Sequence, residues 1–340
     1  MANRYFYSMI LVTGGTGLIG SHLLFRLVKN GKNVKASYRN KDRLQNVLKV
    51  FGYYTDNPSE LFKKIDWVQA DLVDIGSLEL LFDGVEYVYH CAAMISFDPS
   101  DYPALVKNNS VGTANIVNQC LERRIKKLCY VSSIATIGPS APGKEANEEN
   151  EWNDTNISVY GLTKQDAELE VWRGSQEGLS VVIVNPGVVL GPGFWKSGSG
   201  SLFTYASKGK KSFIPGGTGF VTISDVASSM VQLMESKIEG ERFILVNENL
   251  TYQEILQKIA PNLGSKAPIK RIPFWVLECF WRLDWLRSKL FGKSRKLTKS
   301  VTKGLYKREI YTSEKIIKAL GFKFENLDSA IGFCCSKFKG

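Results

Sequence analysis

Histidine is scarce in this chain of 340 residues, which contains only His22 and His90. A hydrolase that uses a Ser-His-Asp triad or a metal needs one of these residues as a base or ligand, and neither lies in a suitable cluster. The six cysteines form no Cys-x-x-Cys pair, which speaks against zinc and disulfide frameworks. The sequence therefore predicts no metal site and a reducing, cytoplasmic location.

Long apolar runs are also missing. The two stretches of 18 residues or more without an acidic or basic side chain, 5–25 and 178–195, each contain four glycines, so a transmembrane helix is not expected. Residues 1–8 include no apolar segment, and a secretory signal is not expected either. With 44% hydrophobic and 23% charged residues, the composition is that of a globular protein.

The positive charge of the chain is concentrated in one segment. Lysine and arginine number 44 and aspartate and glutamate 33, which gives a net charge of +11. Residues 282–308 contain ten basic side chains and one acid, Asp284, so this segment alone carries +9. Because the remainder is nearly balanced, a nucleic-acid partner is not expected.

Aromatic side chains crowd the start of the same region, 274–308. Five of them fall within twelve residues: Phe274, Trp275, Phe280, Trp281 and Trp285. Aromatic residues followed by basic ones are typical of a helix at a membrane surface, which would make the protein peripherally membrane-associated. A helix that closes a substrate pocket or forms a homodimer face has the same composition, and this second interpretation is favoured.

Short apolar runs alternate with helix-length segments through the first 185 residues. Such alternation predicts a parallel sheet covered by helices on both faces, a doubly wound α/β fold. The expected strands are 9–13, 33–38, 65–70, 85–91, 127–132 and 180–185. The expected helices are 18–29, 41–51, 75–82, 103–123 and 159–176.

A smaller, discontinuous second domain is expected after residue 190. The sheet domain would comprise 9–190 and about 219–247, and a substrate-binding domain 191–218 and 248–340. Glycine, serine and lysine dominate 191–219, which is typical of a mobile loop beside a ligand. The predicted lining of an apolar pocket includes Ile95, Ser96, Phe97, Phe194, Trp195, Phe203 and Tyr205.

Glycines recur every third residue where the first strand becomes the first helix, at Gly14, Gly17 and Gly20. In a strand–turn–helix context this spacing is the fingerprint of a Rossmann dinucleotide site. The first glycine permits a tight turn, the second lets the backbone approach a pyrophosphate, and the third lets helix and strand pack closely. The predicted cofactor cradle also includes Thr16, Leu18 and Ile19.

The residue after the second strand distinguishes NADP from NAD. An acid there would bind the ribose 2′-hydroxyl of NAD, but this chain has Arg39, with Arg43 close behind. A guanidinium suits a 2′-phosphate, so NADP(H) is favoured and NAD(H) stays an alternative. Asp71 and Leu72, after the third strand, are predicted to meet the adenine edge, with a surface turn as the alternative.

A tyrosine and a lysine, Tyr160 and Lys164, lie on one face of one helical turn. The spacing alone is weak, because Tyr311 and Lys315 repeat it. Position separates the two pairs. Tyr160 opens the helix that follows the strand ending near Ser133, at the carboxyl edge where cofactor and substrate meet. The first pair is therefore the predicted catalytic one.

Six short motifs occur in one order along the chain. They are TGGTGLIG at 13–20, HCAA at 90–93, NSVGT at 109–113, VSS at 131–133, YGLTK at 160–164 and NPGVVLGPG at 185–193. Together they resemble the extended short-chain dehydrogenase/reductase superfamily over about residues 9–230. Arg39 and a tail with RKLTKSVTKGL and then LGF resemble its dihydroflavonol reductase and 3β-hydroxysteroid dehydrogenase-like branch.

The resemblance implies an NADP(H)-dependent oxidoreductase that acts on a small-molecule carbonyl or secondary alcohol. Tyr160 would exchange a proton with the substrate, Lys164 would favour the phenolate and hold the nicotinamide ribose, and Ser133 would stabilise charge on the reacting oxygen. Asn109 would anchor a water that leads to Lys164, or it holds a loop. The other residues implied at the cofactor are Ala92, Ala93, Pro186, Gly187 and Val188.

Two other functions stay open at this point. A nucleotide-sugar epimerase would keep NAD tightly bound, and would oxidise and then re-reduce one sugar carbon. A redox-sensing or scaffold protein would keep the dinucleotide fold without turnover. The presence of Ser133, Tyr160 and Lys164 together speaks against this last function, because a site that no longer catalyses a reaction has no physical reason to keep all three.

Overall fold

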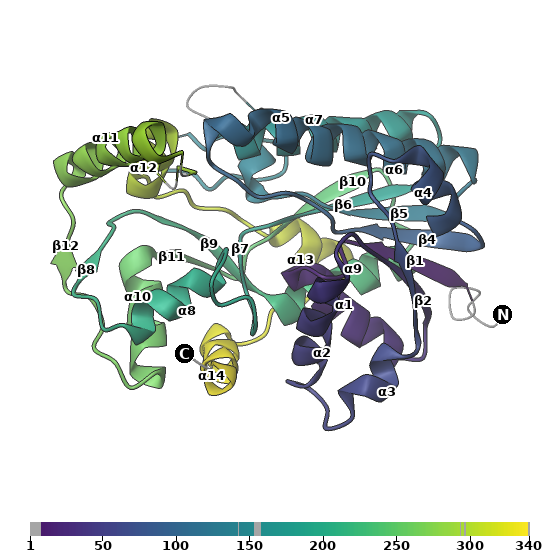
Figure 1. Cartoon of the computed structure of the whole chain (residues 1–340), viewed down its shortest axis with the longest axis horizontal. Coiled ribbons are helices and arrows are strands. Elements are labelled where there is room, and N and C mark those ends of the chain that lie inside the picture. Colours follow the sequence, from purple (N-terminus) through teal and green to yellow (C-terminus); the bar gives the residue numbers. More distant parts are fainter. Residues whose placement is uncertain (1–7, 142, 153–157, 293, 296, 339–340) are drawn as a thin grey trace.

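A seven-stranded sheet, parallel throughout, forms the centre of the computed structural model (Figure 1). The strand order is β10-β6-β5-β4-β1-β2-β3. The strands are β1 (Met9–Thr13), β2 (Asn33–Tyr38), β3 (Ile65–Gln69), β4 (Val85–His90), β5 (Lys127–Val131), β6 (Val181–Pro186) and β10 (Glu241–Leu245). This is the predicted doubly wound α/β fold.

The structure describes most of the chain. The described ranges are 8–141, 143–152, 158–292, 294–295 and 297–338. Two residues of the predicted basic segment, Lys293 and Lys296, therefore lie outside the described residues.

Helices cover both faces of the large sheet (Figure 1). One face carries α4 (Ile75–Leu81), α6 (Gly112–Glu122) and α7 (Val159–Gln176). The other face carries α1 (Leu18–Lys29), α2 (Leu44–Phe51), α9 (Ile223–Glu235) and α13 (Glu314–Leu320). Every residue of the central strands β5 and β6 is buried, as packing on both faces requires. The predicted elements 9–13, 18–29, 33–38 and 159–176 are confirmed to the residue.

The rest of the chain builds two small sheets and the helices around them. One sheet joins β7 (Val188–Leu190), β9 (Gly217–Thr222) and β11 (Glu248–Thr251), and the other joins β8 (Ser212–Phe213) and β12 (Lys270–Arg271). A separate hydrophobic cluster is shared by α8 (Gly200–Ser207), α10 (Tyr252–Asn262) and α14 (Leu327–Lys337). The helices α11 (Phe274–Phe291) and α12 (Lys299–Tyr306) lie at the same end of the molecule as β8 and β12 (Figure 1).

Two predicted details of the elements are wrong. Residues 191–219 are not one loop, because they contain α8, whose Phe203 and Ala206 are core residues. The short helix α3 (Pro58–Phe62) was not expected. The helix expected over 103–123 is found as an unbroken helical run of α5 (Tyr102–Leu105), a π-helical segment (Val106–Val111) and α6, of which only the π-helical segment was not predicted.

Two elements do not follow the predicted division of the chain into domains. β10 joins the large sheet, but β9, part of which was assigned to the sheet domain, pairs with β7 and β11. Conversely α13, from the segment assigned to the substrate domain, packs on β10 through the buried side chain of Ile316. The domain boundaries themselves stay a prediction.

Candidate active site

The loops that follow six parallel strands meet at one edge of the large sheet, because parallel strands all end on the same side. Taken along the chain from β1 to β6, these loops carry the glycine turn, Arg39, Asp71, Ala92 with Ala93, Ser133 and Gly187. Tyr160 joins them from the start of α7. The structure thus brings most of the predicted site residues to one place.

Gly14 and Gly20 are required by the protein itself. The φ angle of Gly14 is +68°, which favours glycine, and a Cβ there would lie 2.6 Å from the Cα atom of Ala92. A Cβ on Gly20 would overlap the carbonyl oxygen of Gly14. The tight turn and the close packing of helix on strand are therefore present in the structure.

Neither the backbone conformation nor the packing of the protein requires glycine at position 17. Its φ of −92° and ψ of 178° suit any residue, and a Cβ would meet only the carbonyl oxygen of Gly14, at 3.4 Å. Gly17 precedes α1, and the first turn of that helix, within Leu18–Lys29, has no acidic residue. The open space over Gly17 and the unpaired N–H groups of the helix end fit the pyrophosphate of a dinucleotide.

The residues after β2 and β3 differ in what they bind. Arg39 is exposed, and its Nη1 donates to Oδ1 of Asn108 at 2.6 Å. Asp71 uses its carboxylate to accept a backbone N–H two residues on, and the carbonyl oxygen of Leu72 accepts from Asn115. Arg39 therefore presents a cation at the site, whereas Asp71 and Leu72 are engaged within the protein.

Tyr160 is half-buried and contacts Phe97 edge-on, with the ring centroids 5.7 Å apart. Burial raises the pKa of its phenol to about 12, and a hydrogen bond with the Ser133 hydroxyl opposes that shift. Because this pKa lies far above neutrality, the phenol holds its proton near pH 7. The structure thus places a proton donor beside Ser133.

The amine of Lys164 bonds the strand beside α7, and its effect on the phenol pKa of Tyr160 stays a prediction. Its Nζ donates to the hydroxyl of Tyr130 at 2.5 Å and to the carbonyl oxygen of Val131 at 2.9 Å. Burial lowers the pKa of Lys164 to about 7, and the nearby Glu168 carboxylate opposes the shift. The ammonium is directed at the neighbouring strand β5, so burial dominates the pKa of Tyr160.

A chain of buried polar groups runs from Lys164 to the glycine turn. Thr113 bonds the hydroxyl of Tyr130, and its Oγ1 lies 3.0 Å from Nε2 of His90. Nδ1 of His90 lies 2.6 Å from Oγ1 of Thr13, the last residue of β1. Burial lowers the pKa of His90 to about 3, so its ring is neutral. These bonds fix α6, α7 and three strands relative to one another beneath the site.

Asn109 holds the loop after β4. Its Oδ1 accepts from the backbone N of Met94 at 2.7 Å, and its Nδ2 donates to the carbonyl oxygen of Met94 at 3.0 Å and to Oγ1 of Thr163 at 3.1 Å. Both amide protons are therefore used. This is the loop-holding alternative of the two predicted roles, and a water that leads to Lys164 stays a prediction.

The turn after β6 is also shaped by packing. β6 ends at Pro186, and a Cβ on Gly187 would overlap the carbonyl oxygen of Gly219. Val188 then opens β7, which pairs with β9. The chain therefore changes sheets at Gly187, at the same edge as the glycine turn.

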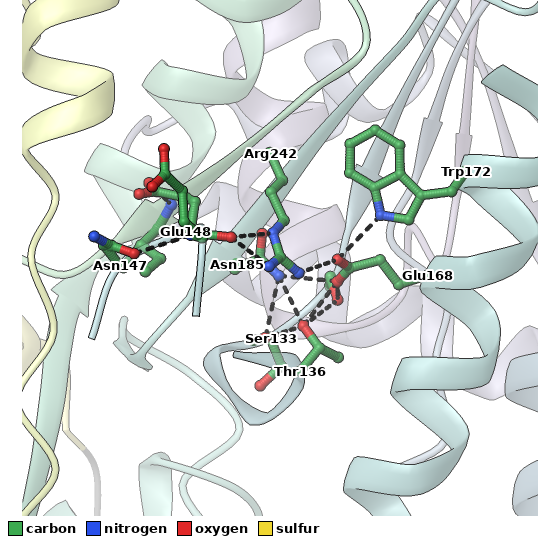
Figure 2. Close-up of polar contacts among 11 residues, drawn as sticks. Ser133, Thr136, Asn147, Glu148, Glu168, Trp172, Asn185 and Arg242 are labelled. Carbon is green, nitrogen blue, oxygen red and sulfur yellow. Dashed lines mark hydrogen bonds and ion pairs between the residues drawn. The ribbon is translucent and has the colours of Figure 1, made fainter. Parts of the chain in front are cut away.

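Glu168, which no motif singled out, fixes the turn that carries Ser133 (Figure 2). It is 1% exposed and lies one turn after Lys164 on α7. Its carboxylate accepts from Ser132 Oγ (2.5 Å), Thr136 Oγ1 (2.7 Å), Asn185 Nδ2 (2.9 Å) and Arg242 Nη1 (3.0 Å). Thr136 and Asn185 also donate to the carbonyl oxygen of Ser133. The sequence signal for Glu168 was its position, one helical turn after Lys164 on the predicted helix 159–176.

A cavity of about 380 Å³ lies next to the start of α7, and Phe97, whose ring contacts Tyr160, is part of its lining. The lining also includes Val159, Trp281, Trp285 and Lys299, so α11 closes the cavity on one side. The prediction for Phe97 is confirmed. Four other predicted lining residues pack into the hydrophobic clusters instead: Phe194, Trp195, Phe203 and Tyr205.

Comparison with known proteins agrees with this arrangement. The model of the NAD dependent epimerase/dehydratase family matches residues 10–246. The chain belongs to this family. Its members bind NAD(P), and the protein is therefore an enzyme of the oxidoreductase and epimerase type.

Relatives within the NAD dependent epimerase/dehydratase family include plant reductases. Tetraketide alpha-pyrone reductase 2 of Arabidopsis thaliana is 30% identical over 265 residues, which are 74% of this chain and 81% of that protein. Dihydroflavonol 4-reductase of Dianthus caryophyllus is 27% identical over 250 residues, 69% of this chain and 68% of that protein. These relatives confirm the predicted branch.

A solved structure shows the same fold. The crystal structure of yeast methylglyoxal/isovaleraldehyde reductase Gre2 complexed with NADPH has a TM-score of 0.74 and 20% sequence identity, and the match covers 97% of each chain. The likeness extends over both the large sheet and the smaller C-terminal part.

Proposed function

We propose that this enzyme is an NADP(H)-dependent reductase that converts a small carbonyl compound into a secondary alcohol. The observation that carries the proposal is the phenol of Tyr160, which holds its proton, bonds Ser133 and contacts Phe97, a residue that also lines the cavity closed by two tryptophans. A protonated phenol is suited to protonate the oxygen of a carbonyl group that binds next to it.

The residues of the site divide the work of such a reduction. The bound dinucleotide would supply the hydride at its nicotinamide ring. Tyr160 donates its proton to the substrate oxygen, and the Ser133 hydroxyl stabilises charge that develops there. Lys164, held by Tyr130 and Val131, keeps one N–H for the ribose hydroxyls.

The pyrophosphate site can be tested at Gly17. In Gly17→Ala the new Cβ meets no atom of the protein closer than 3.4 Å, so the melting temperature should change little. The methyl group would occupy the space of the pyrophosphate, and we expect roughly tenfold or greater loss of NADPH affinity by titration calorimetry.

The matched variant is Gly20→Ala, whose Cβ would overlap the carbonyl oxygen of Gly14. Gly20→Ala should therefore have a lower melting temperature than the wild type. If Gly17→Ala melted as early as Gly20→Ala, or bound NADPH as tightly as the wild type, the pyrophosphate would not lie over Gly17.

The preference for NADP(H) rests on Arg39. We expect Arg39→Asp to favour NADH over NADPH, because a carboxylate repels the 2′-phosphate and accepts from the 2′-hydroxyl. Arg43→Asp, at an exposed position in the same segment, makes the same charge change and should leave the preference in place. The ratio of kcat/KM with the two cofactors is the measurement, and an unchanged ratio in Arg39→Asp contradicts the proposal.

Purification without added cofactor separates the reductase from an epimerase. A reductase should be isolated without nucleotide and should bind NADPH more tightly than NADH, whereas an epimerase should retain NAD. Thermal-shift measurements with NADPH and a panel of aldehydes, sterols, flavonoid-type ketones and nucleotide sugars then identify the substrate class. Retained NAD would overturn the proposed function.

The proposed place of action is the cytoplasm. All six cysteines are unpaired, which suits a reducing compartment. The small-molecule substrate would occupy the cavity next to the start of α7. Region 274–308 closes that cavity with the inner side of α11, which leaves the outer side of the helix for a membrane or a second subunit. We keep the division 191–218 plus 248–340 as the proposed substrate-binding domain.

A further inference from the structure

The outer side of α11 is apolar. The inner side of α11 is marked by buried or half-buried residues at helical spacing, which are Leu277, Trp281, Asp284 and Ser288. The opposite stripe has the same spacing, and Arg282 is its one charged residue among Trp275, Cys279, Leu283, Leu286 and Leu290. Trp275 is 68% exposed and Leu290 67%. A helix on the surface of a globular protein normally shows the reverse order, with polar residues outward.

Exposed apolar side chains are concentrated around this helix. Among the described residues, 18 large apolar side chains are exposed, and nine of them lie within 269–291. Beyond α11 itself the group includes Ile269, which is 75% exposed. Single exposed apolar residues are ordinary, but a contiguous group marks an interaction surface.

Exposed lysine and arginine side chains are concentrated at the same end of the molecule as the apolar stripe. β12 pairs with β8 and leads into α11 at the same end of the molecule (Figure 1). The segments 208–213 and 264–273 contain no acidic residue. Their basic side chains are all exposed, and they are Lys208, Lys210, Lys211, Lys266, Lys270 and Arg271. We call this surface, with the outer stripe of α11, the α11 face.

The charge of the α11 face selects its partner. A second copy docked here about a two-fold axis would bring the same basic residues opposite one another, which is unfavourable. Anionic phospholipid head groups complement them, and exposed tryptophan and leucine suit the boundary between head groups and acyl chains. No helix of the described residues is long and apolar enough to cross a membrane. The helix would therefore lie in the plane of the surface.

We propose that the α11 face binds the surface of an anionic phospholipid bilayer. The full-length protein, without substrate or cofactor, is sedimented with vesicles of phosphatidylcholine containing about 30% phosphatidylserine, and with pure phosphatidylcholine vesicles. We expect binding to the anionic vesicles, and a fall in binding of roughly tenfold or more when sodium chloride is raised from 0.1 M to 0.5 M. The outcome is independent of the reaction assigned to Tyr160.

Two triple variants test the surface. In Leu283→Glu, Leu286→Glu and Leu290→Glu combined, vesicle binding should fall roughly tenfold or more. The matched control places glutamates at three other exposed apolar residues, Ile75, Leu80 and Leu169. It adds the same charge and should leave binding near the wild-type value. Circular dichroism verifies that both variants are folded.

Three results would overturn the proposal. The first is an absence of vesicle binding, and the second is equal binding to anionic and neutral vesicles. The third is a dimer in sedimentation equilibrium, without lipid, that the α11 variant dissociates and the control does not. This last result would show that a second copy of the chain covers the α11 face.

Discussion

Replacement of Tyr160 by phenylalanine should abolish turnover and leave NADPH binding almost unchanged. The variant keeps the ring and its edge contact with Phe97, so the shape of the cavity is preserved. It removes the hydroxyl that bonds Ser133 and that serves as the proton donor. We expect kcat to fall by about 10²- to 10⁴-fold. Steady-state kinetics and NADPH titration are the measurements.

Tyr311 provides a matched control for this variant, because it also precedes a lysine by four residues. It contacts Asn249 through its backbone and packs near β10. Tyr311→Phe should therefore retain wild-type kcat. Wild-type turnover in Tyr160→Phe, or an equal loss in both variants, would contradict the catalytic assignment of Tyr160.

Removal of the Glu168 carboxylate should destabilise the enzyme more than any exposed substitution on α7. In Glu168→Ala, Arg242 loses its ion pair and Asn185 loses one of its acceptors (Figure 2). The hydroxyl of Ser132 loses its short hydrogen bond to the carboxylate. Loss of one partner from a buried ion pair costs about 3 to 5 kcal/mol. We expect a lower free energy of unfolding by that amount in urea titration.

Glu170→Ala on the same helix is the control. Glu170 pairs with Arg173 where both side chains are about one-third exposed, so its loss should cost about 0.5 kcal/mol. The smaller Glu168→Gln change should keep part of the stability but misplace Ser133, and kcat should fall more than KM changes. Equal unfolding energies for the two alanine variants would contradict a structural role for Glu168.

The backbone of the sheet could be predicted well because local signals mark its elements. Glycines bound the first strand and helix, and the elements 9–13 and 18–29 are found as predicted. Helix α8 was missed because the glycine, serine and lysine of 191–219 are typical of a loop. Its apolar positions do follow helical spacing but span little more than one turn, and the helices α10 and α14 that they pack against lie far along the chain.

Side-chain direction was harder to predict than position. The four-residue spacing placed Lys164 on the same side of α7 as Tyr160, but the direction of its amine depends on Tyr130, a residue of β5. Asn109 likewise binds Met94, 15 residues away in the chain. Contacts of this kind arise when strands and helices pack, and spacing within one helix contains no information about them.

The two sides of α11 have a joint consequence for substrate supply. Trp281 and Trp285 line the cavity next to the start of α7, and Trp275 and Leu290 point away from it into the surroundings. An enzyme seated on lipid in this way takes up hydrophobic molecules laterally, from the leaflet itself. Its rate would then follow the mole fraction of substrate among the lipids, and diluting that substrate with inert lipid would slow turnover at constant bulk concentration.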